Sequence, residues 1–503
     1  MKLSQFPLKA MSGVLAIIFL CIASAVRAQE PGADSAPLFR ENAAFRVGVE
    51  RIKLPGNETM GMLGVNYLIE LTPTLYFGPA VYGAVTGQRG GFYTAGGELA
   101  WGHEIAGDLM FVGGAYVGGG GGGASLVGGG LMVRPHADLM WRFDGYRVGL
   151  SASSVRFPNG HIRSNQVGLI VDFGTSFLHT NFGNMGQNWS VTERTGVGFD
   201  RALMFAGAYH PRSGSTNLSK VPLQKPIGYV GARMEQLVTP NLFWGVEGAG
   251  AVSGGVPGYA EFLGTVGAEM PIWGERAKIG ARLALGMGGG GSIDVGGGML
   301  VKTGVYAAVS LSRNVHASLE GGVAASPNGN FRASYGTLAL HWDLDHPHES
   351  GSSSRIVGNE WVAGTQHYFK AARRDGSKSD MNSVTIKLNR FISDSFYLTG
   401  QAHSAYSGQA GGYSAGLIGA GYRTPKRFGM QAGDELLAGA GAGGGVDSSG
   451  GAVMQPMAYL SLDITKSISA RLSAGRIKSL RGGLNSNVAE VGLSYSFGAG
   501  SRN

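Results

Sequence analysis

The chain has 503 residues, of which 88 are Gly, 43% are hydrophobic and 15% are charged. This share of apolar residues is enough to bury a core, so the composition excludes a disordered chain. The formal net charge is +8, but Lys and Arg are scattered and no basic run is interleaved with aromatic residues, which argues against a nucleic-acid partner.

The first segment predicts export. Residues 1–28 combine Lys2 and Lys9 with a following apolar run and with Ala28 before a polar residue. This order is typical of a cleaved secretory signal peptide. We expect cleavage after Ala28, with Ala25 as the alternative.

Cys21 is the only cysteine and lies within this signal segment. The mature protein is therefore expected to have no thiol and no disulfide. Beyond the signal, no uninterrupted apolar run of about 18 residues occurs, which excludes a transmembrane helix. An exported apolar chain of this kind is expected to be a secreted β-protein or an outer-membrane barrel.

Three diverged copies of one pattern follow. The segment GGGLMVRP at 128–135 returns as GGGMLVKT at 296–303 and more weakly as SGGAVMQP at 449–456, and a glycine run precedes each copy. We expect the three copies at 45–173, 199–344 and 359–497. The remaining parts are expected to be a short N-terminal segment at 29–44, connectors at 174–198 and 345–358, and a C-terminal extension at 498–503.

Within each copy, apolar and polar residues alternate. From Leu131 to Phe143 every second residue is apolar, and the residues between them are largely polar or charged. A period of two predicts a β-strand with one apolar and one hydrated face, and about eight such segments occur in each copy. Pro135 and Pro456 lie inside apparent strands and predict local bulges.

The connections between these strands alternate in length. Short turns such as 144–145 are followed by longer loops such as 210–226 and 370–382, which is the asymmetry of a transmembrane barrel. Because lipid offers no partners to a free strand edge, the sheet should close. The sequence predicts an all-β fold, a transmembrane antiparallel β-barrel of about 24 strands built from three internal repeats of about eight strands each. Three separate eight-stranded barrels are the alternative, disfavoured by short linkers such as 345–358.

The signal, the alternating strands, the turn asymmetry and the terminal VGLSYSF together resemble Gram-negative outer-membrane β-barrel proteins of the porin-like class, with no narrower subfamily. The resemblance implies an outer-membrane location, membrane lipid as surroundings, and a C-terminal signal that the barrel insertion machinery reads. That signal would be Val491, Leu493, Tyr495 and Phe497. Six residues follow Phe497, whereas proteins of this class usually end on the aromatic residue.

Polar side chains alternate with the apolar ones, and they would line a watery lumen if the apolar side chains face lipid. The candidates are Arg134, His136, Asp138, Arg142, Lys302, Gln455 and Asp463. A charged lining of this kind selects solutes by charge and size, whereas the plainer interpretation is hydration of a wide pore.

The expected function is a pore that passes solutes or an extracellular polymer such as polysaccharide across the outer membrane, without catalysis, cofactor or metal. The glycine runs match no phosphate-binding motif, and the His- and Asp-rich stretch 341–349 matches no standard metal site. One alternative is an outer-membrane enzyme acting on lipid or polysaccharide, with His103 beside Glu104 or His136 near Asp138 as candidates. The other alternative is a structural or adhesive barrel at the cell surface.

Overall fold

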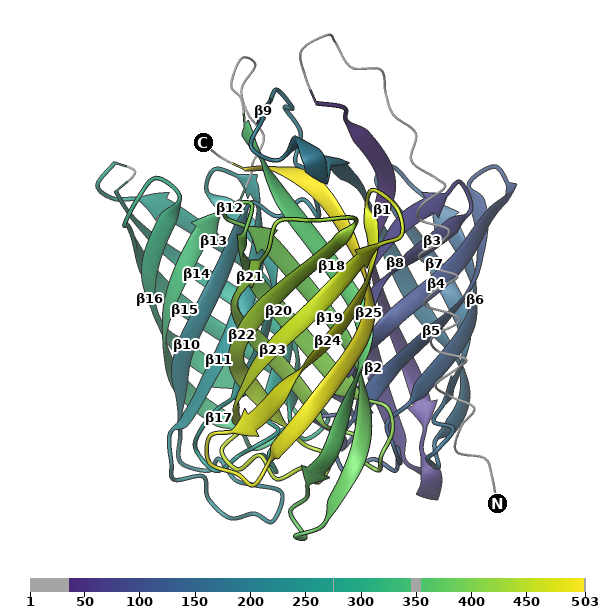
Figure 1. Cartoon of the computed structure of the whole chain (residues 1–503). Helices are drawn as coiled ribbons and strands as arrows, with labels where there is room; N and C mark the ends of the chain where they lie inside the picture. Colours follow the sequence, from purple (N-terminus) through teal and green to yellow (C-terminus); the bar gives the residue numbers. More distant parts are fainter. Residues whose placement is uncertain (1–35, 275, 345–353, 502–503) are drawn as a thin grey trace.

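The structure is a computed structural model that describes residues 36–274, 276–344 and 354–501, and within this part of the chain it has 25 strands (Figure 1). Two single-turn 3-10 helices, η1 (Pro55–Asn57) and η2 (Phe182–Asn184), are the described helical elements. No helix among the described residues is long and apolar enough to cross a membrane.

Eight antiparallel strands, each paired with the next in the chain, form the first barrel. They are β1 (Phe39–Lys53), β2 (Thr59–Thr72), β3 (Leu75–Thr86), β4 (Tyr93–Ala106), β5 (Leu109–Gly121), β6 (Met132–Arg142), β7 (Tyr146–Arg156) and β8 (Arg163–Asn181). The barrel closes because β1 also pairs with β8, with Val47 opposite Val171.

The second barrel is a closed ring of the next eight long strands. They are β10 (Arg201–Pro211), β11 (Ile227–Thr239), β12 (Leu242–Ala251), β13 (Ala260–Pro271), β14 (Ala277–Gly289), β15 (Met299–Ser310), β16 (Val315–Ala325) and β17 (Arg332–Asp343). Closure comes from β10 pairing with β17, with Ala206 opposite Leu338.

The third barrel follows the same plan. Its strands are β18 (Ser354–Ala372), β19 (Lys378–Phe391), β20 (Phe396–Ala405), β21 (Ser414–Arg423), β22 (Met430–Ala442), β23 (Ala452–Asp463), β24 (Ile468–Ser479) and β25 (Asn485–Ser501). Here β18 closes the ring with β25, and Ala363 lies opposite Leu493. The two-residue strand β9 (Asn188–Trp189) pairs with the start of β18 and joins the third barrel to the connector before the second.

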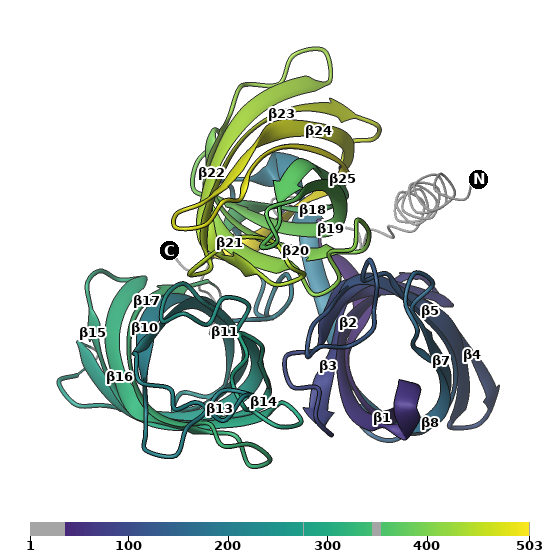
Figure 2. The same cartoon turned by 90° about the horizontal axis from the view of Figure 1, so that it is seen from below.

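The expectation of one barrel of about 24 strands is wrong. Each set of eight strands closes on itself, and Figure 2 shows the three barrels side by side around a common centre. The alternation of apolar and polar residues determines which face of a strand points outward. This alternation is the same in a barrel of eight strands and in a barrel of 24. It therefore carries no information on where the ring closes.

Strand ends also differ from the expected boundaries. β1 begins at Phe39 because it pairs with the extended end of β8, and β25 continues past Phe497 to Ser501 alongside β18. Pro135 causes no bulge, since Val133 and His136 keep one register against β7, and the same holds around Pro456. The expected signal peptide, with Cys21, lies outside the described residues.

All three barrels have the same two ends. The "turn end" carries the short turns, such as 73–74 and 240–241, and the "loop end" carries the glycine-rich connections. Between the ends, large apolar side chains point outward, for example Val305, Leu319 and Leu338, which are 63–67% exposed. So broad an exposed apolar surface is typical of the lipid-facing band of a membrane barrel.

Candidate functional site

Ion pairs fill the inside of the first barrel. The Arg46 guanidinium lies 2.7 Å from the Asp172 carboxylate and 2.9 Å from that of Asp138. Arg134 donates two hydrogen bonds to the Glu50 carboxylate, at 2.9 and 3.0 Å. A cavity of about 20 Å³ remains beside these groups, the size of one water. An eight-stranded barrel is just wide enough to be filled in this way.

The second barrel holds a network around Lys302. The Lys302 ammonium lies 2.9 Å from the Glu247 carboxylate and 2.8 Å from that of Glu261. The Arg282 guanidinium bridges Glu247 and Glu320, at 3.2 and 2.7 Å. All five side chains are buried, so each charge is neutralised by its partners rather than by bulk water.

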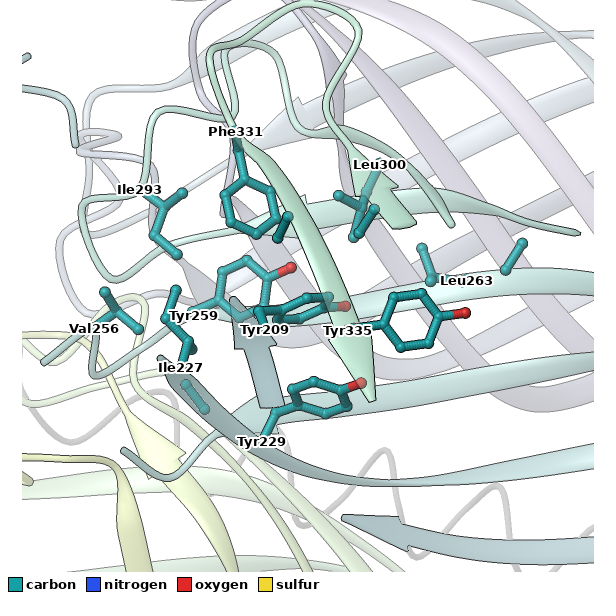
Figure 3. Packing of buried hydrophobic residues seen from close by; sticks show 14 of the residues in the cluster. Tyr209, Ile227, Tyr229, Val256, Tyr259, Leu263, Ile293, Leu300, Phe331 and Tyr335 are labelled. Carbon is teal, nitrogen blue, oxygen red and sulfur yellow. The ribbon is translucent and has the colours of Figure 1, made fainter. Parts of the chain in front are cut away.

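An apolar and aromatic layer covers this network at the loop end (Figure 3). The Lys302 ammonium lies 5.1–5.5 Å from the ring centroids of Tyr209, Tyr229 and Tyr335. Beyond these rings pack Ile293 and Phe331 from the loops. The lumen is thus closed twice, by ion pairs and by an apolar cap.

The third barrel has the same construction. The Lys387 ammonium lies 2.8 Å from the Glu435 carboxylate and 3.1 Å from that of Glu490, and Arg471 contacts Glu435 at 2.5 Å. The Gln366 side-chain amide donates a hydrogen bond to the Gln455 side-chain oxygen at 3.2 Å, and both residues are buried. A separate apolar cluster covers this interior at the loop end.

The structure separates the residues predicted to line one lumen. Five of them are buried inside barrels, namely Arg134, His136 and Asp138 in the first, Lys302 in the second and Gln455 in the third. Arg142 and Asp463 lie at the turn end, where they pair with Glu104 and Lys426. Asp138 was predicted from the sequence, but the other carboxylates that neutralise the buried cations, such as Glu50, Glu247 and Glu261, were not; they lie at inward positions on strands across the barrel.

A cavity of about 1290 Å³ lies between the three barrels, and we name it the central chamber. Outward-facing side chains of all three barrels line it, and nearly all of them are apolar. Two from each barrel are Val65 and Leu99, Val266 and Leu285, and Ile386 and Leu388. The chamber is larger than the pockets of about 300–1,000 Å³ that hold drug-sized ligands.

Six glycines form a ring that joins the three barrels at the loop end. All six have φ between 88° and 103°, a region that side chains disfavour. Within the first barrel, a Cβ on Gly122 would lie 2.1 Å from the Gly91 oxygen. The ring consists of Gly91 and Gly122, Gly258 and Gly290, and Gly412 and Gly443.

Contacts between barrels complete this glycine ring in cyclic order. A Cβ on Gly91 would lie 2.2 Å from the nitrogen of Gly290 in the second barrel, and one on Gly412 would lie 2.8 Å from the nitrogen of Gly122 in the first. The Gly412 N–H donates to the Gly120 oxygen at 3.0 Å. The glycine runs are therefore the surfaces on which each barrel packs against the next.

Aromatic rings join the barrels at the turn end. Phe45 of the first barrel, Phe199 of the connector and Trp244 of the second barrel form a triangle with centroid distances of 5.3–5.9 Å. Each of the three lines the central chamber. The chamber thus extends from this aromatic cluster toward the glycine ring.

The expected insertion signal lies on β25, in the strand that closes the third barrel. Val491 is exposed, Leu493 and Tyr495 are half-buried, and Phe497 is buried. Phe497 packs 5.2 Å from the Trp361 ring, measured between centroids. Its recognition by the insertion machinery stays a prediction.

No set of three or more His, Cys, Asp or Glu side chains in the described residues is arranged to hold a metal ion. Of the His- and Asp-rich stretch 341–349, Asp345, His346, His348 and Glu349 lie outside the described residues. His103 stacks on Trp101, and His136 bonds to Asp138.

A serine, a histidine and an aspartate that the sequence did not single out meet at the turn end of the second barrel. The Ser310 hydroxyl lies 3.0 Å from His316 Nδ1, and His316 Nε2 lies 3.1 Å from the Asp343 carboxylate. A histidine held in this way can accept a serine proton at one nitrogen while donating to the aspartate from the other.

No protein-family model matches the chain. No curated protein matches its sequence. Among solved structures it is similar to the outer membrane protein OpdK from Pseudomonas aeruginosa, at 10% identity and a TM-score of 0.23 over 91% of this chain and 98% of that one. It is also similar to OccAB3 from Acinetobacter baumannii, at 9% identity and a TM-score of 0.22 over 91% of this chain and 99% of that one.

A third similar structure is the siderophore receptor PirA from Pseudomonas aeruginosa, at 9% identity and a TM-score of 0.27 over 93% of this chain and 81% of that one. At these TM-scores the likeness supports neither a shared arrangement of barrels nor a shared substrate.

Proposed function

We propose that this chain is an outer-membrane protein that takes up an acyl-chain-bearing solute in the central chamber, so that the solute passes between the barrels. The observation that carries the proposal is the contrast between the two kinds of interior. The lumens are filled by buried ion pairs such as Lys302 with Glu247, whereas the chamber has about 1290 Å³ behind an apolar wall. Transfer of an acyl chain from water to such a wall is favourable.

The outer-membrane location in this proposal is supported by the outward apolar band and by the short turns opposite longer loops. Membrane lipid would contact this band, and the insertion machinery would read the end of β25. A polysaccharide is the less suitable cargo for the chamber, because its hydroxyls would find few partners on an apolar wall.

The test is binding of a fluorescent polyene fatty acid, cis-parinaric acid, to the purified protein in detergent. Ala363 lines the chamber, whereas Ala474 of the same barrel faces outward on β24 and is not part of the chamber wall. We expect saturable binding that Ala363→Trp weakens and Ala474→Trp leaves unchanged. Equal binding by both variants would refute the chamber as the binding site.

A second candidate function, hydrolysis of a lipid ester, is supported by the Ser310, His316 and Asp343 contacts. Its test is release of fatty acid from a fluorogenic phospholipid by the wild type, by Ser310→Ala and by the control Ser312→Ala in the adjoining turn. Activity that only Ser310→Ala abolishes would establish the hydrolase. Absence of activity in the wild type would dismiss it.

A further inference from the structure

Four basic side chains gather on the outer face of the first barrel at its loop end. They are Arg51 and Lys53 on β1, Arg156 on β7 and Arg163 on β8, and all four are exposed. In the described part of the chain none of the four forms an ion pair. We name these four residues the basic cluster.

Within the basic cluster, Arg156 lies directly opposite Arg163 in the β7–β8 ladder. Side chains opposed in this way have Cβ atoms about 4.5–5.5 Å apart, and like charges there repel. The Lys53 backbone N–H donates to the Ser164 hydroxyl at 2.8 Å, so the Lys53 backbone lies next to the residue that follows Arg163 on β8. Three cationic residues therefore lie on adjacent strands, where a bound anion would offset their repulsion.

The residues at the corresponding positions of the β16–β17 and β24–β25 ladders are not two like charges. Arg332 lies opposite Ala325 in the second barrel, and its guanidinium donates to backbone oxygens of its own loop. Lys478 lies opposite Asn485 in the third barrel. The opposed arginines are thus a feature of the first barrel and not a requirement of the shared fold.

The same three strands carry the outward apolar band on the side of the basic cluster that faces the middle of the barrel. Val49, Leu169 and Leu150 form one row across β1, β8 and β7, and they are 46%, 56% and 55% exposed. Arg51 follows Val49 by two residues, a rise of about 7 Å along the strand, whereas Arg156 and Arg163 lie six residues, or about 20 Å, beyond Leu150 and Leu169. The basic cluster therefore extends from the apolar row toward the loop end, on the side where a lipid headgroup would lie.

We infer that the basic cluster binds the phosphate of a phosphorylated membrane lipid whose acyl chains lie on the row of Val49, Leu150 and Leu169. The planar fork of an arginine matches two phosphate oxygens at once, and two arginines are directly opposite one another across two strands here. A bound phosphate would turn the repulsion between Arg156 and Arg163 into attraction to a shared anion. This inference requires that the barrels span a membrane and is independent of any cargo in the central chamber.

The test compares lipid retention in nanodiscs of phosphatidylcholine doped with lipid A, which carries two phosphates, or with the same lipid after removal of its phosphates. The proteins are the wild type, Arg156→Gln/Arg163→Gln, and the control Arg476→Gln/Lys478→Gln, which removes equal charge at the same end of the third barrel. Native mass spectrometry counts the lipid kept by each protein. We expect the arginine variant to retain about tenfold less phosphorylated lipid, the loss expected for one charge-assisted hydrogen bond. The control should retain as much as the wild type.

The inference would be overturned if the three proteins retained equal amounts of the phosphorylated lipid. It would also be overturned if the wild type retained the dephosphorylated lipid as well as the phosphorylated one. Displacement of the lipid by an equal concentration of inorganic phosphate would overturn its lipid part and assign the cluster to free phosphate. Thermal unfolding in detergent without lipid guards against a misfolded variant. The arginine variant should unfold at the same or a higher temperature, since repulsion is removed. A lower temperature would assign the two arginines to the fold instead.

Discussion

Gly91 of the first barrel and Gly290 of the second lie so close that a Cβ on Gly91 would be 2.2 Å from the Gly290 nitrogen. Equivalent contacts join Gly412 to Gly122 and, at 3.5 Å, Gly258 to Gly443. Backbone packing therefore holds the three barrels together at the loop end. A Cβ on Gly91 or Gly412 would clash with the backbone of the neighbouring barrel, whereas one on Gly258 would make an ordinary van der Waals contact.

The first prediction concerns Gly91→Ala. The added methyl must displace the backbone of the neighbouring barrel, so we expect it to cost about 1–3 kcal/mol more than a matched control. The control is Gly145→Ala, at a φ of 77° in the turn before β7, where an added Cβ meets no atom within 4 Å. Urea unfolding in detergent measures both. Equal losses would mean that the contact between Gly91 and Gly290 does not hold the barrels together.

A second prediction concerns the filled lumen. Lys302→Met leaves the carboxylates of Glu247 and Glu261 buried with one partner fewer, and removing one member of a buried ion pair costs about 3–5 kcal/mol. Lys426→Met breaks an exposed pair with Asp463, 2.8 Å apart, and should cost less than about 1 kcal/mol. Urea unfolding of the two variants under one condition compares them. A similar small cost for both would show that the lumen around Lys302 is hydrated.

The third prediction is that the protein gives no large single-channel conductance in planar bilayers. Each lumen is closed by ion pairs and by an apolar layer such as that of Tyr209 and Phe331, so ions find no continuous water path through it. Recordings in high salt on purified protein test this. Stable large steps, abolished by heat denaturation, would show that a wide lumen exists.

The alternation of apolar and polar residues predicted the strands and their outward apolar faces, and the alternating lengths of the connections predicted the two unlike ends, because each of these features is local in the sequence. Barrel closure did not follow, since Val47 would show the same alternation beside Val171 or beside Leu493. The central chamber could not be predicted either. Leu388 lines it and Leu472 faces outward away from it, yet their exposed fractions are 53% and 57% and both alternate with polar residues.

Some of the residues inside the barrels could be predicted from the sequence. Lys302 was predicted to point inward, and it does, but its partners Glu247 and Glu261 come from other strands. Which carboxylates meet Lys302 depends on which strands form one barrel. The pairing could not be predicted, because the barrel was expected to have three times as many strands as it has. The glycine runs recur at one place in each repeat, and this predicted a shared structural role for them. Their packing against the next barrel could not be predicted, because it depends on how the three barrels are arranged in space.

Cross-linking of engineered cysteines tests the claim of three separate rings most directly, because the chain has a single cysteine at position 21. Cysteine pairs replacing Val47 with Val171, Ala206 with Leu338, and Ala363 with Leu493 should each form a disulfide or react with a short thiol cross-linker, since these residues lie opposite one another where the barrels close. A pair replacing Val47 with Leu493 should stay unlinked. Linkage of Val47 to Leu493 with none of the three closing pairs formed would contradict the account and restore one large barrel.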